Sequence, residues 1–104
     1  MVRALPGRGV TGAIGPGRLL LVTVDAARGA ATERIERALI ERMGVSETRR
    51  LHPGALVVHA DASAAQVRDW ALDADASARV FVVEFDRWSC AGDFDMAWLT
   101  RRGH

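Results

Sequence analysis

Two aspartates stand where apolar runs end, and they are the first candidates for chemistry in this chain. Asp25 follows LLLVTV, residues 19–24, and Asp61 follows ALVVHA, residues 55–60. Mg²⁺ prefers carboxylate oxygens, and a bound ion can activate water to cleave a phosphodiester. Asp25 is therefore a candidate catalytic and metal-binding residue, and Asp61 a candidate second metal ligand. The structural alternative is that each acid leads into a helix and stabilises its positive end.

Three arginines are candidate nucleic-acid contacts. Arg28 precedes a predicted helix, where backbone N–H groups favour phosphate binding. Arg49 and Arg50 are adjacent on a polar segment that is typical of an edge strand, and both could contact a phosphate backbone. The alternative for Arg28 is a solvated loop. For Arg49 and Arg50 it is protection of the edge against pairing with another chain.

Two histidines and the single cysteine offer further chemistry. His52 and His59 could each act as a general base near neutral pH. Cys90 could act as a nucleophile if a neighbouring base lowered the pKa of its thiol. Neither histidine has an acid partner that is visible in the sequence, and nothing close to Cys90 in the sequence would activate it. A packed or surface position is therefore favoured for the two histidines, and a buried packing role for Cys90.

In the segment VVEFDRWSCAGDFDMAWL, residues 82–99, three large aromatic side chains follow the predicted strand: Trp88, Phe94 and Trp98. Side chains of this size bury large areas and favour packed environments. Asp95 can cap a last short helix on which Phe94, Trp98 and Leu99 share one side. The segment is acidic, whereas aromatic platforms for nucleobases usually carry interleaved cations. We expect these aromatics to cover a sheet face or to contact a partner subunit.

The elements that must position these residues follow from local patterns. Apolar or extended runs predict strands over 19–24, 47–52, 55–60 and 79–86. Helices are predicted between them, one from an N-cap at Thr32 to Gly44 and one from a Ser63–Gln66 capping box to about Asp73. This order is that of a ferredoxin-like domain. The expected fold is α+β, with a four-stranded antiparallel sheet, two helices on one face and an aromatic C-terminal extension.

Two consequences for the candidate sites follow from this expected fold. The first and third strands are expected to run parallel at the centre of the sheet, which would bring Asp25 and Asp61 to one rim. The first and last strands are apolar on both sides, so the sheet face away from the helices needs a cover. A twofold partner or the aromatic tail would supply that cover.

Length and composition indicate one small domain. The chain has 104 residues, and we expect a flexible Gly-rich arm over 1–18, a domain over 19–104 and a tail from about residue 87. A formal net charge of +1 indicates no strong electrostatic attraction to nucleic acids or membranes. No apolar run is long enough to span a membrane, so no membrane association is expected. With a single cysteine there is no internal disulfide, and a cytoplasmic protein is expected.

Several motifs occur together in one order: ALVVHAD, then QVRDW in a capped helix, then VFVVEFD, then a Trp-x-x-x-Gly tail that ends in Trp-Leu. In this order the chain, roughly from Leu19 to Leu99, resembles the bacterial SinR-like proteins. These are related to virulence-associated protein D toxins and to CRISPR-associated integration-adaptor nucleases. Asp25 matches the position of the metal-binding aspartate in those nucleases. The loop that follows departs from the family, because Arg28, Gly29 and Ala30 replace a Pro-Gly and an aromatic residue.

The resemblance implies a ferredoxin-like homodimer with a candidate Mg²⁺-dependent nuclease site and RNA or DNA as partner. The main alternative is a non-catalytic, dimeric interaction or regulatory module that uses the sheet face and the aromatic tail. A third hypothesis is an accessory oxygenase-type dimer, which would need a ligand cavity between the sheet and the helices.

Overall fold

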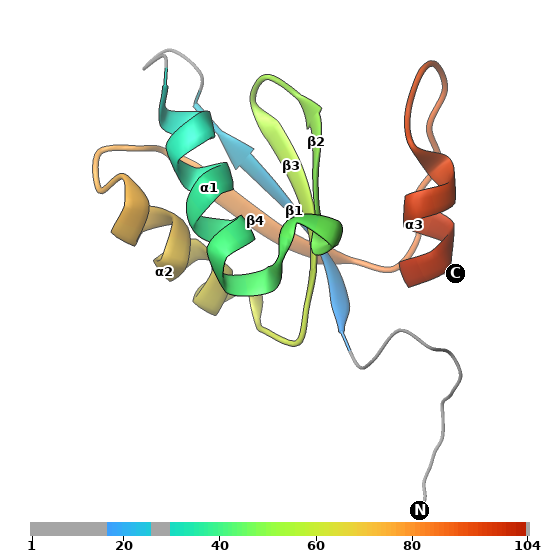
Figure 1. The fold of residues 1–104 in the computed structure, drawn as a ribbon, viewed down its shortest axis with the longest axis horizontal. Coiled ribbons are helices and arrows are strands. Elements are labelled where there is room, and N and C mark those ends of the chain that lie inside the picture. Colours follow the sequence, from blue (N-terminus) through green and yellow to red (C-terminus); the bar gives the residue numbers. More distant parts are fainter. Residues whose placement is uncertain (1–16, 26–29, 104) are drawn as a thin grey trace, which may run out of the picture.

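The computed structural model describes residues 17–25 and 30–103 (Figure 1). Their secondary structure comprises β1 (Arg18–Val24), α1 (Ala31–Met43), the 3₁₀ helix η2 (Val45–Glu47), β2 (Thr48–His52), β3 (Ala55–Ala60), α2 (Ala64–Ala74), β4 (Val80–Phe85) and α3 (Met96–Gly103). The predicted α+β class with four antiparallel strands is confirmed. Residues 1–16 of the predicted arm lie outside the described residues, and the strand that follows begins at Arg18.

The strand order across the sheet is β2-β3-β1-β4, and every neighbouring pair is antiparallel. The expectation that β1 and β3 run parallel is therefore wrong. The helical crossover leaves β1 and β2 running the same way, and the hairpin then reverses the chain into β3. In the resulting register Arg18 faces Ala60 and Thr23 faces Ala55. Asp25 and Asp61 consequently lie at opposite ends of the sheet.

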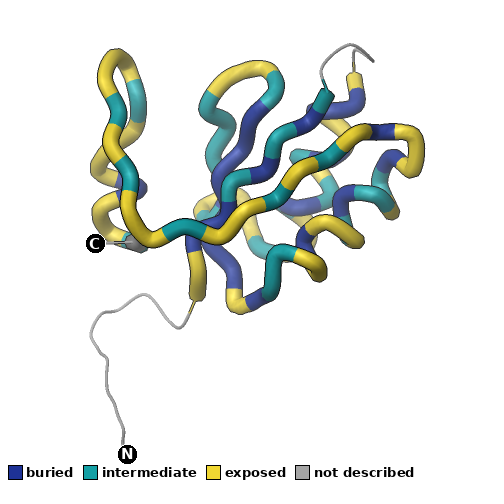
Figure 2. The backbone as a smooth tube through the Cα atoms, turned by 180° about the vertical axis from the view of Figure 1, so that it is seen from behind, coloured by how far each residue is buried: buried dark blue, intermediate teal, exposed yellow. Residues whose placement is uncertain are grey.

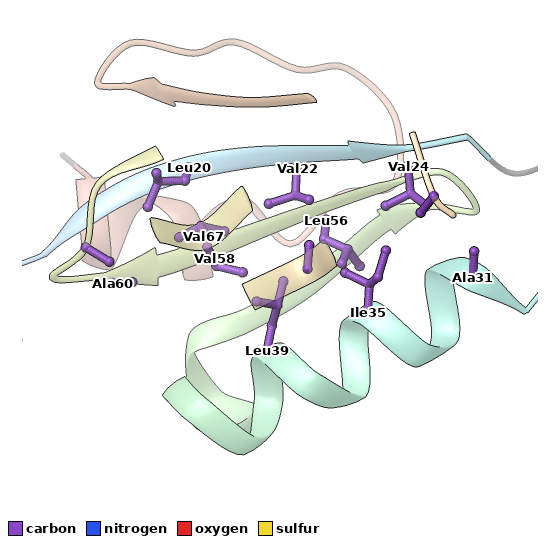
Figure 3. Packing of buried hydrophobic residues seen from close by; sticks show 13 residues of the cluster. Leu20, Val22, Val24, Ala31, Ile35, Leu39, Leu56, Val58, Ala60 and Val67 are labelled. Carbon is purple, nitrogen blue, oxygen red and sulfur yellow. The ribbon is translucent and has the colours of Figure 1, made fainter. Parts of the chain in front are cut away.

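One sheet face packs against α1 and α2 and forms the main core (Figure 3). Alternate residues of the central strands point to this face, as a strand with period two requires. The fully buried side chains in this core are Leu20, Val22, Ala31, Ile35, Leu39, Leu56, Val58, Val67 and Ala71. This core holds α1 and α2 against one face of the sheet. Any cover of the opposite face must come from other residues.

The two helix starts differ in how well local sequence predicts them. The capping box at α2 is confirmed, because the Gln66 N–H donates to Ser63 Oγ at 3.1 Å and the Ser63 N–H donates to Gln66 Oε1 at 2.9 Å. The predicted N-cap at Thr32 is wrong. The N-cap of α1 is Ala30, while Thr32 lies inside the helix with a buried side chain. No side chain of the described residues caps α1, and the first turn of the helix is buried instead.

The second face of the sheet, called here the open face, carries α3 at one end. Figure 1 shows α3 on the other side of the sheet from α1 and α2. Trp98 and Leu99 of α3 are buried there with Leu19 and Val57, and Trp88 packs against the same cluster. Among the described residues, no helix is both long enough and apolar enough to cross a membrane.

Candidate functional site

Asp25 is half-buried just beyond the end of β1, beside the start of β4. Its backbone N–H donates to the Arg79 carbonyl oxygen at 3.0 Å, and its Oδ2 lies 4.0 Å from Arg79 Nη1. Thr23, Arg79 and Phe81 line a shallow hollow together with Asp25. Asp25 therefore lies at the rim of the open face, with a cation beside its carboxylate.

Asp61 is exposed beyond the far end of β3, so one chain cannot hold one ion between Asp25 and Asp61. In the part of the chain that the structure describes, no three His, Cys, Asp or Glu side chains gather as a metal site would require. What the described residues show is that Asp25 and Asp61 of one subunit are too far apart to bind the same ion.

The predicted nucleic-acid contacts are divided between two faces of the sheet. Arg50 pairs with Glu36 at 2.6 Å, on the side of α1. Arg49 pairs with Asp95 at 3.3 Å on the open face, and its guanidinium lies over the Trp98 ring. Arg28 lies outside the described residues. Because Arg49 and Arg50 already have carboxylate partners, a phosphate would have to compete for them.

A buried polar cluster, invisible in the sequence, holds α3 to the open face. His59 Nδ1 lies 2.9 Å from Glu47 Oε1, and Arg102 donates to both oxygens of Glu47 at 3.0 and 2.9 Å. Arg102 also donates to the carbonyl oxygens of Ser46 and Trp98, at 3.0 and 3.2 Å. We call His59, Glu47 and Arg102 the clamp.

Electrostatics in the clamp favour an ionised Glu47. Hydrogen bonds from Arg102, with smaller contributions from His59 and Ser46, lower the pKa of Glu47 from 4.5 to about 2, although burial opposes them. His59 thus has an acid partner that the sequence did not reveal. The ring is also closely packed, since a Cβ placed on Gly17 would lie 2.6 Å from His59 Nε2. These contacts make His59 a packed residue of the clamp.

An apolar groove of about 410 Å³ lies between the open face and the segment that leads to α3. Its apolar walls come from Leu21, Val57, Val83, Phe85, Trp88 and Phe94. His52 and Cys90 also line it, so the structure brings together a histidine and a cysteine that the sequence treats separately. Trp88 and Phe94, two of the predicted packing aromatics, form part of its wall, and the third, Trp98, is buried under α3.

Beyond the reach of α3, the open face exposes apolar side chains of β4. Phe81 is 66 % exposed and Val83 is 38 % exposed. Figure 2 shows the same contrast, with β4 teal and yellow where β1 and β3 are largely dark blue. We call Phe81 and Val83 the β4 patch. The sequence predicted an apolar sheet face that needs a cover, with the unbroken apolar run over 80–83 as its signal, but did not indicate which residues of that face stay exposed.

The fold and this surface define a small α+β protein in which the described residues cover one face of the sheet only partly. Comparison of the chain with family models, curated proteins and solved structures found no match. The SinR-like resemblance therefore stays a prediction, and the function must be argued from the surface itself.

Proposed function

We propose that this chain is a ferredoxin-like protein that acts as a homodimeric interaction module, with the β4 patch at the subunit interface. The order of its elements and the strand order β2-β3-β1-β4 support the ferredoxin-like assignment, with α3 as an added C-terminal helix. The observation that carries the proposal is the exposure of Phe81 and Val83 side by side on the open face.

Apolar surface of this kind favours association. Complete burial of a Phe or Val side chain contributes about 1.5–3 kcal/mol, so even partial burial of the patch in both subunits of a symmetric dimer favours association. The patch adjoins the half-buried Leu21 and Phe85, so the apolar surface extends beyond its two residues. A second copy is the chosen occupant because the patch lies on an edge strand that can pair with its own copy.

The dimer is tested by the double variant Phe81→Ser/Val83→Ser. We expect the wild-type chain to sediment as a dimer at micromolar concentration and the double variant to sediment as a monomer. Both should keep the same far-ultraviolet circular dichroism. Val45→Ser is the matched control, because Val45 is 66 % exposed on η2, away from the patch. A monomeric wild type, or a double variant that stays dimeric, would refute the proposal.

A metal-dependent nuclease centred on Asp25 is the second proposal. It is supported by the position of Asp25 at the rim of the open face, beside Phe81. Two subunits would each have to supply an Asp25, because Asp61 of the same chain lies at the other end of the sheet. Mg²⁺ is the proposed ion and RNA or DNA the proposed substrate.

The nuclease proposal predicts cleavage of RNA or DNA that requires Mg²⁺ or Mn²⁺. Asp25→Asn should abolish this cleavage, whereas Asp61→Asn, the same substitution at the opposite end of the sheet, should leave it unchanged. Both variants should keep the wild-type oligomeric state. The measurement is the rate of cleavage of labelled RNA and DNA with and without the ion. Absence of ion-dependent cleavage, or equal loss in the two variants, would count against this activity.

A further inference from the structure

We infer that two copies of the chain join by antiparallel pairing of their β4 strands, with the twofold axis at Val82. This inference rests on the proposed homodimer and specifies how its subunits meet. The two sheets would continue into one another, and the open faces of both copies would lie on the same side.

The backbone of β4 has one side available for such pairing. β4 forms an edge of the sheet, and its only neighbour among the described strands is β1. The Asp25 N–H donates to the Arg79 carbonyl oxygen at 3.0 Å, which directs the backbone groups of the odd-numbered residues toward β1. Hydrogen bonding alternates along an antiparallel strand. The N–H and C=O groups of Val80, Val82 and Glu84 therefore point outward, away from the sheet.

The two edges of the sheet differ in how well they resist pairing. At β2 the register shifts between Arg50 and His52, and Arg49 and Arg50 both hold ion pairs there. Bulges and cations of this kind protect an edge. The register of β4 with β1 is continuous from Phe85 to Val80, and the strand VFVVEF contains no proline. Self-association is therefore expected at β4.

The pairing register follows from the faces of the strand. Residues directly opposite one another in an antiparallel pair point to the same face. In β4 the odd-numbered residues point to the open face and the even-numbered residues to the helix-covered face. An odd-numbered residue must therefore lie opposite an odd-numbered one, and an even-numbered residue opposite an even-numbered one. With the axis at Val82, Phe81 of each copy lies opposite Val83 of the other, on the open face. Val82 meets its own copy on the helix-covered face. The β4 patch thus forms two aromatic–aliphatic cross-strand pairs, a combination that stabilises sheets.

Charge distinguishes this register from the one with its twofold axis at Val83. An axis at Val83 would place Arg79 opposite Arg87 of the second copy, and like charges directly opposite one another are destabilising. With the axis at Val82, Arg79 lies opposite Phe85 of the second copy on the open face, and no like charge stands directly opposite it.

This register also keeps the two copies of Asp25 in the dimer apart. Each Asp25 lies next to its own Arg79, and the two Arg79 positions fall at opposite ends of the seam, about 20 Å apart along the strands. The two copies of Asp25 could then not share an ion. The dimer joined through β4 and the nuclease site shared by two copies of Asp25 therefore exclude one another, and one experiment can distinguish them.

The experiment is cysteine cross-linking in the full chain with Cys90 replaced by serine. In the proposed register two Val82→Cys side chains meet at a backbone separation of about 5.5 Å, which suits a disulfide. Two Val83→Cys positions would be about 8 Å apart and two Val80→Cys positions about 14 Å apart, both too far. After mild oxidation we expect at least tenfold more covalent dimer from Val82→Cys than from either of the others.

A second pair of cysteine variants tests the same register if Val82→Cys fails to fold. Val80→Cys and Glu84→Cys should cross-link when mixed and not when either is oxidised alone, since Val80 lies opposite Glu84 of the second copy. Sedimentation of each reduced variant separates the two levels of failure. A dimer that cross-links best through Val83→Cys, or through none of these positions, overturns the β4 register alone. A monomer overturns the homodimer as well.

Discussion

Replacing Trp98 with alanine is expected to lower the free energy of unfolding by about 3–5 kcal/mol, the usual cost of truncating a buried aromatic side chain. Trp98 is only 1 % exposed, and its indole N–H donates to the Ser46 carbonyl oxygen at 2.6 Å. The Arg102 guanidinium also lies 4.5 Å from the centre of its ring. A domain of this size has about 5–15 kcal/mol of stability, so this one substitution removes a large part of it.

Urea unfolding followed by circular dichroism measures this loss, and two variants set its scale. Trp98→Phe keeps most of the packing but leaves the Ser46 carbonyl without its indole donor, so an intermediate cost is expected. Met96→Ala is the control on the same helix, because Met96 is 48 % exposed and should change stability by less than about 0.5 kcal/mol. A loss below about 1 kcal/mol for Trp98→Ala would show that α3 does not stabilise the open face.

Removing the positive charge of Arg102 from the clamp is expected to cause the second large loss of stability. Arg102→Met keeps most of the side-chain volume but leaves Glu47 without its main hydrogen-bond donor. We expect a cost of about 2 kcal/mol at pH 7, below the usual value for a fully buried pair because Glu47 keeps partial contact with solvent. Arg101→Met is the matched control, since Arg101 is the exposed neighbour on the same helix. It should have little effect.

The pH dependence identifies the charge responsible. The pKa of Glu47 is lowered from 4.5 to about 2 in the folded chain, so its stabilising effect is fully present above pH 4.5 and is lost as the pH falls toward 2. The pKa of Asp75 is also lowered to about 2, chiefly by the hydrogen bond from Arg34, and contributes equally to wild type and variant. The stability difference between wild type and Arg102→Met should therefore shrink from pH 7 to pH 3. A constant difference would assign the effect to packing.

Much of the fold could be predicted because it depends on local patterns. The apolar runs that became β1, β3 and β4 were found within one or two residues of their bounds, and the Ser63–Gln66 capping box marked the start of α2. These signals involve residues that are close in sequence. Thr32 shows the limit, because the local rule for an N-cap competed there with burial of the first turn of α1.

The candidate sites were harder to predict, because they depend on how distant segments meet. The pairing of Asp25 with Asp61 followed from an assumed strand direction, and one reversal in the hairpin placed the two acids at opposite ends of the sheet. Glu47 and Arg102 are 55 positions apart and became partners only when α3 docked on the open face. No periodicity along the chain encodes either relation.

The amino-acid sequence by itself determined where strands and helices form and that the sheet carries apolar side chains on both faces, because period and composition act within each segment. The tertiary structure alone decided which part of the second face α3 covers and which part stays exposed as Phe81 and Val83. The physical reason is geometric. The eight-residue helix α3 is shorter than the open face, and the loop before α3 determines which part of that face the helix packs against. The remaining apolar edge is where the function of this protein is proposed to lie.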